Sequence, residues 1–89
     1  MSDLTTLRNL GPASARMLRE AGIDNRAELE RLGAVLAYKI VRHQRPGVSL
    51  NLLWALWGAL HDRDWRSLSA NEKATLRAEV DEPLQVRPG

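Results

Sequence analysis

The chain has 89 residues, a formal net charge of +2 and no cysteine. A chain of this length leaves room for one hydrophobic core, and without cysteine it forms neither disulfides nor thiolate metal sites. No apolar run is long enough to span a membrane, and the first residues lack the basic-then-apolar pattern of a signal peptide, so we expect a cytoplasmic protein without membrane partners.

Helix signals recur along the chain, whereas β-branched residues are sparse and no segment alternates for long, so we expect an all-α fold. Gly11-Pro12, Gly22 and Gly33 interrupt the helical pattern, and Arg45-Pro46-Gly47 indicates a loop. The helices are expected up to about residue 9 and then over residues 12–21, 25–32, 34–43, 50–60 and 69–80.

Polar residues predict where three of these helices begin. Asn25 with Glu28, and Ser69 with Glu72, have the three-residue spacing of an N-cap and its reciprocal carboxylate. Ser49 is a good N-cap for the most apolar segment, which has hydrophobic residues on nearly every face and must therefore be central or shared. We expect a compact bundle of five to six short helices, forming one domain over residues 1–80 with a flexible tail over 81–89.

The front half of the sequence resembles itself at an offset of 22 residues. Residues 7–18 and 29–40 share two leucines, a glycine (Gly11 and Gly33) and a later alanine. The shared pattern is a helix, a tight turn at glycine and a second helix that packs closely through alanine. Two related helical hairpins are one explanation, and chance matching of common residues is the other.

The segment from Asn9 to Ala15 resembles the hairpin of the helix-hairpin-helix group, usually written G-I-G-P-K-T-A. Asn9 replaces the first glycine, a mild change because asparagine tolerates left-handed geometry, and Ala13 replaces the usual basic residue. The resemblance implies a tandem helix-hairpin-helix-like (SAM-like) arrangement whose backbone N–H groups meet DNA phosphate. The nearby basic residues that can replace the missing contact are Arg8, Arg16 and Arg19.

Over residues 7–76 the chain resembles the C-terminal domain of the TfoX (Sxy) family of bacterial competence regulators. The residues that carry this resemblance are Leu10-Gly11-Pro12, Gly22-Ile23, Leu32-Gly33-Ala34-Val35, Tyr38, the run from Ser49 to Leu56, and Gly58-Ala59-Leu60. The resemblance implies a helical domain that, in full-length members, follows a separate N-terminal domain and contributes to regulating DNA-uptake genes. We therefore expect a non-catalytic module with sequence-tolerant DNA binding in a competence or transcription-regulatory setting.

Positive charge is concentrated in the middle of the chain, because residues 31–61 contain no Asp or Glu. A solvated helix face is the alternative explanation for this segregation. The charge segregation and the hairpins together indicate which residues bind nucleic acid. The expected residues are Arg8, Gly11, Ser14, Arg16, Gly33, Lys39, Arg42 and Arg45.

The alternative function is a protein-interaction or homodimerisation module that does not bind nucleic acid. Trp54 and Trp57 lie three residues apart in the most apolar helix, and we assign Trp54 to the core. An excess apolar face on a small domain favours a partner contact, for which the candidates are Leu53, Trp57 and Leu60.

No catalytic constellation is recognisable in the sequence. His43 and His61 lie on different predicted helices, where surface or capping roles are expected, and the carboxylates fall at caps or on polar faces. We therefore expect no enzymatic activity, cofactor, metal or small-molecule substrate.

Overall fold

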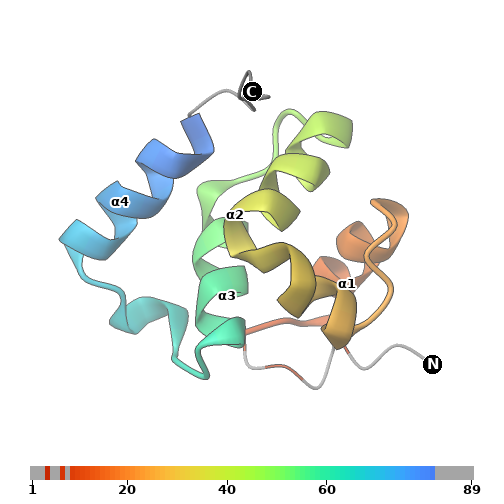
Figure 1. Cartoon of the computed structure of the whole chain (residues 1–89), viewed down its shortest axis with the longest axis horizontal. Helices are drawn as coiled ribbons and strands as arrows, with labels where there is room; N and C mark the ends of the chain where they lie inside the picture. Colours follow the sequence, from red (N-terminus) through yellow and green to blue (C-terminus); the bar gives the residue numbers. More distant parts are fainter. Residues whose placement is uncertain (1–3, 5–6, 8, 82–89) are drawn as a thin grey trace, which may run out of the picture.

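The fold consists of helices packed around one buried helix. The computed structural model describes residue 4, residue 7 and residues 9–81. These residues form α1 (Pro12–Glu20), α2 (Arg26–Gln44), α3 (Leu50–Leu60), the short 3-10 helix η2 (Trp65–Ser67) and α4 (Ala70–Asp81), and they form no strand. In Figure 1, α2 and α3 lie side by side at the centre, with α1 and α4 at opposite ends. The predicted all-α class is confirmed.

The predicted count of five to six helices is not confirmed, because the described residues form four α-helices and η2. The helices expected over 25–32 and 34–43 both fall within α2. Most of the helix expected before residue 10 lies outside the described residues, although Leu7 and Leu10 each donate a backbone hydrogen bond three residues back. At the other end, α4 includes Asp81, and residues 82–89 of the expected tail lie outside the described part.

The helix α2 bends at Gly33, whose φ of 81° and ψ of 164° are not helical. Glycine adopts this backbone without strain because it has no Cβ. The break therefore falls where the sequence predicts it. Its counterpart in the repeat, Gly11, has a φ of −94° and a ψ of −175° as the N-cap of α1. The two repeats differ at their shared glycine, so the tandem helix-hairpin-helix arrangement is not confirmed.

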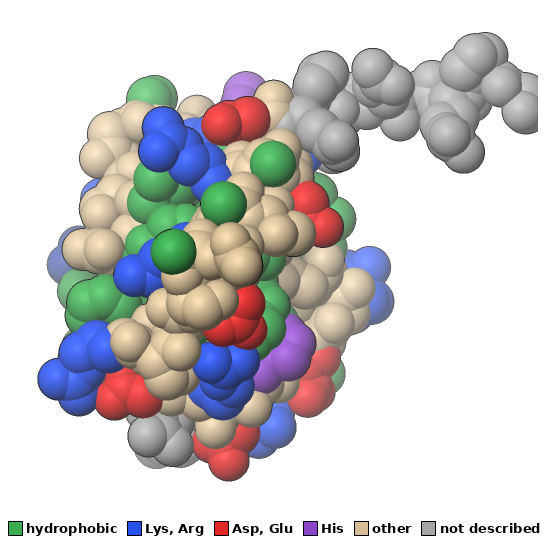
Figure 2. Space-filling model, turned by 90° about the vertical axis from the view of Figure 1, so that its left-hand side faces the viewer, with side chains coloured by type: hydrophobic (Ala, Val, Ile, Leu, Met, Phe, Trp, Pro, Cys, Tyr) green, Lys and Arg blue, Asp and Glu red, His purple; other side chains and the backbone are tan. Residues whose placement is uncertain are grey.

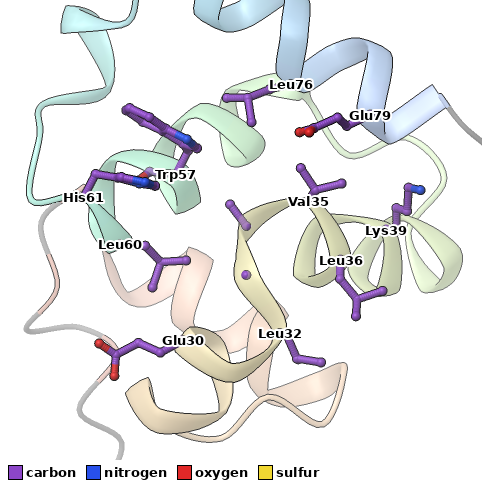
Figure 3. Close-up of a pocket in the computed structure, with 12 residues that line it drawn as sticks. Glu30, Leu32, Val35, Leu36, Lys39, Trp57, Leu60, His61, Leu76 and Glu79 are labelled. Carbon is purple, nitrogen blue, oxygen red and sulfur yellow. The ribbon is translucent and has the colours of Figure 1, made fainter.

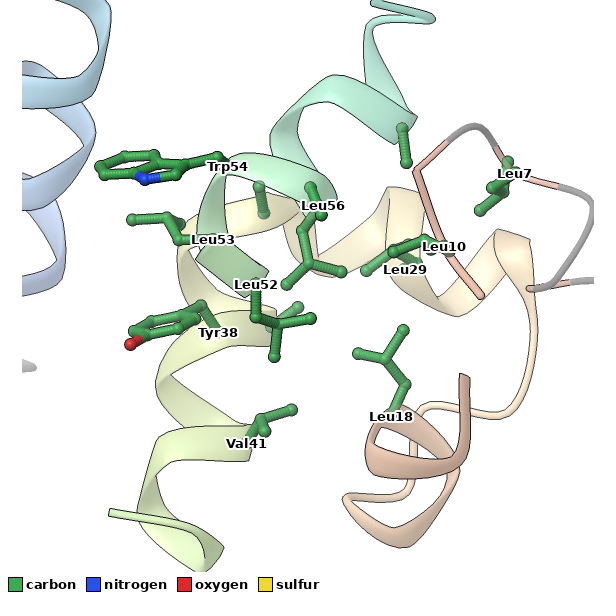
Figure 4. Packing of buried hydrophobic residues seen from close by; sticks show 14 of the residues in the cluster. Leu7, Leu10, Leu18, Leu29, Tyr38, Val41, Leu52, Leu53, Trp54 and Leu56 are labelled. Carbon is green, nitrogen blue, oxygen red and sulfur yellow. The ribbon is translucent and has the colours of Figure 1, made fainter. Parts of the chain in front are cut away.

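The helix α3 is the centre of the hydrophobic core (Figure 4). Its buried residues are Leu52, Leu53, Trp54, Ala55, Leu56, Gly58 and Ala59. Ser49 caps its N-terminus by accepting a hydrogen bond from the Asn51 N–H at 3.0 Å. Within the described part of the chain, no helix is long and apolar enough to cross a membrane.

The burial of α3 decides two predictions. Trp54 is 8% exposed, as its assignment to the core requires. Leu53 is fully buried, and its predicted place in a partner interface is therefore wrong. A side chain enclosed on every side has no surface left to offer to another molecule.

A close junction lies where α3 passes the segment before α1. Asn9 has a left-handed φ of 74°. Its Nδ2 donates to the Arg63 carbonyl at 2.7 Å, and its Oδ1 accepts from the Trp65 N–H at 3.3 Å. A Cβ on Gly58 would lie 2.5 Å from both the Arg63 carbonyl oxygen and the Asn9 Nδ2. We call Asn9, Gly58, Arg63 and Trp65 the Asn9 junction; it fixes the turn after α3.

The helix α4 begins with the predicted capping box. The Glu72 N–H donates to the Ser69 Oγ at 3.1 Å, and the Ser69 N–H donates to the Glu72 Oε1 at 2.9 Å. Two backbone donors at the start of the helix are thus satisfied. Leu76 and Val80 are buried in the core, and α4 packs against α2.

We predict that Gly58→Ala destabilises the fold by about 1–3 kcal/mol, because the new Cβ meets a backbone carbonyl and the clamped Asn9 side chain. Chemical denaturation followed by circular dichroism measures this loss. The matched control is Gly47→Ala, where a Cβ meets no atom within 4 Å and the change should stay within about 0.5 kcal/mol. Equal losses for the two variants would contradict the close approach.

Candidate functional site

The structure divides the residues predicted to bind nucleic acid among several places. Gly11, Ser14 and Arg16 belong to α1 and its N-cap, and Arg45 reaches α1 from the end of α2. Gly33 and Lys39 instead line a groove between α2, α3 and α4. Arg42 contacts the end of α4, and Arg8 lies outside the described residues.

The first candidate surface is the segment Asn9–Ser14, which we call the hairpin end. Asn9 has a left-handed backbone, which asparagine tolerates. Gly11, Pro12 and Ala13 are exposed, and no side chain of the described residues caps this end of α1. The first N–H groups of a helix lack partners within it and carry the positive end of its dipole. The hairpin end can therefore receive an anion.

Arginines gather further along α1 around one carboxylate. Glu20 lies 3.6 Å from the Arg16 Nε, and its Oε1 accepts a hydrogen bond from the Arg45 guanidinium. The hydrogen bond from Arg45 is the main cause that lowers the pKa of Glu20 below 4.5. With Arg19, which is also exposed on α1, these residues form what we call the arginine corner. Three positive charges and one negative charge leave it basic.

Arg42 has different partners from the arginine corner. Its Nη2 donates to the Val80 carbonyl at 3.3 Å, its Nη1 lies 4.0 Å from the Asp81 carboxylate, and its guanidinium lies 5.8 Å from the Tyr38 ring centroid. The contacts with Val80 and Asp81 join α2 to the end of α4, and the contact with Tyr38 lies within α2. Arg42 therefore has a structural role in addition to any contact with a ligand.

The second candidate surface is the groove between α2, α3 and α4, with a volume of about 660 Å³ (Figure 3). Two sets of predicted residues meet there, since Gly33 and Lys39 were assigned to nucleic acid and Trp57 and Leu60 to a protein partner. The full lining is Glu30, Leu32, Gly33, Ala34, Val35, Leu36, Lys39, Trp57, Leu60, His61, Leu76 and Glu79. Most of these side chains are apolar, as in surfaces that bind apolar groups.

Two neighbouring side chains contact the Trp57 ring in the wall of the groove. The His61 ring stacks on the Trp57 indole at a centroid distance of 3.9 Å, and its Nδ1 donates to the Trp57 carbonyl oxygen at 2.8 Å. The Arg63 guanidinium lies 5.0 Å from the indole centroid, and Arg63 in turn contacts Glu72 at 2.8 and 3.3 Å. These contacts orient the Trp57 indole in the wall of the groove.

The sequence predicts a surface or capping role for His61, and this residue lies at the C-cap of α3. The contact of Arg63 with the Trp57 ring is not predicted from the sequence. Arg63 lies in the turn after α3, and Glu72 lies in α4. Because the two residues belong to different elements, their spacing along the chain does not indicate that they pair.

Charges of both signs surround the groove. Glu30 and Glu79 are acidic, and Lys39 is basic. Figure 2 shows the α4 side of the molecule, where Lys and Arg side chains alternate with Asp and Glu. Among the described residues, no three His, Asp or Glu side chains are placed to hold a metal ion. This side therefore offers no uniformly basic surface to a phosphate backbone.

The chain matches the family model described as the TfoX C-terminal domain over residues 1–80. No curated protein matches it.

Two solved structures from Listeria monocytogenes resemble it. A protein described as uncharacterised, in a triclinic form, is 30% identical with a TM-score of 0.78, covering 83% of this chain and 84% of its own. A protein of unknown function, in a tetragonal form, is 29% identical with a TM-score of 0.80, covering 85% of this chain and 94% of its own.

We predict that Glu72→Gln lowers stability at neutral pH but not in strong acid. The Arg63 hydrogen bond, followed by that of the Ser69 N–H, lowers the pKa of Glu72 from 4.5 to about 2. A carboxylate with a depressed pKa stabilises the fold above its unfolded pKa, and this contribution is lost as the pH falls from about 4.5 to about 2. Thermal unfolding at a series of pH values measures it. A difference between wild type and Glu72→Gln that is the same at every pH would refute this coupling.

Proposed function

Because this chain belongs to the TfoX C-terminal domain family, we propose that it is a non-catalytic module that binds DNA independently of base sequence. In this proposal the hairpin end and the arginine corner contact phosphates, in a regulatory setting like that of full-length family members. No cofactor or metal takes part.

The observation that carries the proposal is the exposed, uncapped N-terminus of α1, with Arg16 and Arg19 further along this helix. Arg45 reaches the same helix from the end of α2. Backbone N–H groups at a helix N-terminus bind phosphate through direct hydrogen bonds and through the helix dipole. Arginine adds bidentate contacts to phosphate oxygens. The absence of a basic side chain at Ala13 makes the arginine corner the main source of charge.

The expected binding is weak, because few phosphates are neutralised. Glu20 also competes with DNA, since it already occupies Arg16 and Arg45. With about two phosphate contacts, raising the salt concentration from about 50 to 200 mM should lower the affinity by around tenfold.

A second candidate function, protein interaction, is favoured by a separate observation. The groove is lined by apolar side chains from three helices, and contacts within the chain already orient the Trp57 indole in its wall. This surface is distinct from the hairpin end, so the two functions are compatible in one molecule.

We predict that Arg16→Ala/Arg45→Ala weakens binding to a labelled DNA duplex and reduces the dependence of log affinity on log salt by about 2. Fluorescence anisotropy titrations at several salt concentrations measure both effects. Arg66→Ala/Arg77→Ala is the matched control, because it removes the same charge from exposed positions elsewhere. The proposal fails if wild type does not bind at low salt, or if both double variants bind equally.

We also predict that Glu20→Gln strengthens DNA binding severalfold. The substitution removes the carboxylate that Arg16 and Arg45 now contact, and frees both side chains for phosphate. The control is Glu30→Gln, which makes the same change in net charge at the groove, where Glu30 pairs with Arg26. If Glu30→Gln strengthens binding as much as Glu20→Gln, net charge and not the arginine corner controls affinity.

A further inference from the structure

The groove has a recessed apolar part between three helices. Val35 of α2, Trp57 and Leu60 of α3 and Leu76 of α4 come from different elements and point towards one space in Figure 3. Trp57 and Leu60 are only partly buried by the chain itself. The recess can therefore take an apolar side chain from outside.

A projecting apolar part lies directly beside this recess, on the same helix. Leu36 and Ile40 of α2 are partly exposed and are one helical turn apart. Leu32, before the bend at Gly33, is also partly exposed. In Figure 3, the side chains of Leu32 and Leu36 lie on the side of α2 that faces away from Trp57 and Leu60. Recess and projection thus form one continuous surface.

The charges around this surface are self-complementary. Glu30 and Glu79 lie on its border together with Lys39. In a two-fold symmetric contact the same patch meets itself, so a border of one sign repels and a border of both signs can pair. Glu79 also repels phosphate, which disfavours nucleic acid as the occupant, whereas Glu30 is already paired with Arg26.

We infer that the occupant of the groove is a second copy of this chain. In the resulting two-fold dimer, Leu36 of each copy enters the recess of the other, beside Leu60. The dimer deepens the protein-interaction function proposed for the groove and is independent of DNA binding. The hairpin ends of both copies stay exposed, so the dimer presents two of them.

The dimer should dissociate on dilution. A standard protein interface uses roughly 20–30 residues on each side. The groove has 12 lining residues, and Ile40 extends it only slightly. An interface at the small end of the range gives an equilibrium between monomer and dimer that shifts with protein concentration.

The first test is sedimentation velocity of the whole chain over about a hundredfold range of concentration. Wild type should shift from monomer to dimer. Leu36→Glu should remain monomeric over the whole range, because it places an unpaired carboxylate in the apolar recess. The control Ala74→Glu, which adds the same charge at an exposed position of α4, should dimerise like wild type.

The second test uses the absence of cysteine in the chain. Leu36→Cys and Leu60→Cys chains are mixed and oxidised, and the heterodimer should form faster than from Leu36→Cys mixed with Ala74→Cys. These single substitutions are milder than a buried charge, so the test remains valid if Leu36→Glu does not fold. A monomeric wild type at the highest concentration, or equal cross-linking of the two mixtures, overturns the dimer.

The outcomes also separate this inference from the DNA proposal. A monomer that binds DNA overturns only the dimer, and a dimer that does not bind DNA overturns only the DNA proposal. A dimer that persists in Leu36→Glu assigns the interface to another surface and overturns the inference as well.

Discussion

The architecture depends on the Asn9 junction. Because Gly58 has no side chain, the Asn9 amide and the Arg63 carbonyl can meet against the backbone of α3. The same Asn9 has the left-handed backbone that begins the hairpin end, and the same turn carries Arg63 to Trp57 and Glu72. One glycine and one asparagine therefore position parts of both candidate surfaces, although these surfaces lie on different sides of the molecule.

Ion pairs reduce the positive field that the arginine-rich sequence predicts. In the sequence, residues 31–61 include several basic residues and no Asp or Glu. In the structure, carboxylates from outside that stretch return to it: Glu20 meets Arg45, Glu28 meets Arg31, and Asp81 lies near Arg42. Exposed pairs of this kind contribute little to stability, but they reduce the field that a phosphate backbone would meet.

The helix α2 connects the two candidate surfaces. Its first part begins after the Asn25 cap, and its bend at Gly33 lies in the lining of the groove. Its C-cap is Arg45, which belongs to the arginine corner. Leu36 and Lys39, on the segment after the bend, are placed by the backbone of Gly33 and not by a continuous helix. If one surface binds phosphate and the other binds a second copy of the chain, the dimer holds its two hairpin ends at a fixed distance and orientation.

The sequence by itself determined the local features: the all-α class, the breaks at Gly11 and Gly33, the caps at Asn25, Ser49 and Ser69, and the central position of the apolar helix. The caps and breaks depend on residues within about one helical turn, and the class and the central helix depend on the pattern of whole segments. The order of residues along the chain contains this information. The TfoX C-terminal domain resemblance also rests on such ordered local motifs.

Only the tertiary structure decided which of these residues meet. It buried Leu53, gave Arg42 and Arg45 different partners, and brought Gly33 and Lys39 to the same groove as Trp57 and Leu60. The Asn9 contacts span more than fifty residues, and the Arg63–Glu72 pair joins two elements across a turn. Such contacts depend on how the helices pack in three dimensions, which the spacing of residues along one chain does not specify.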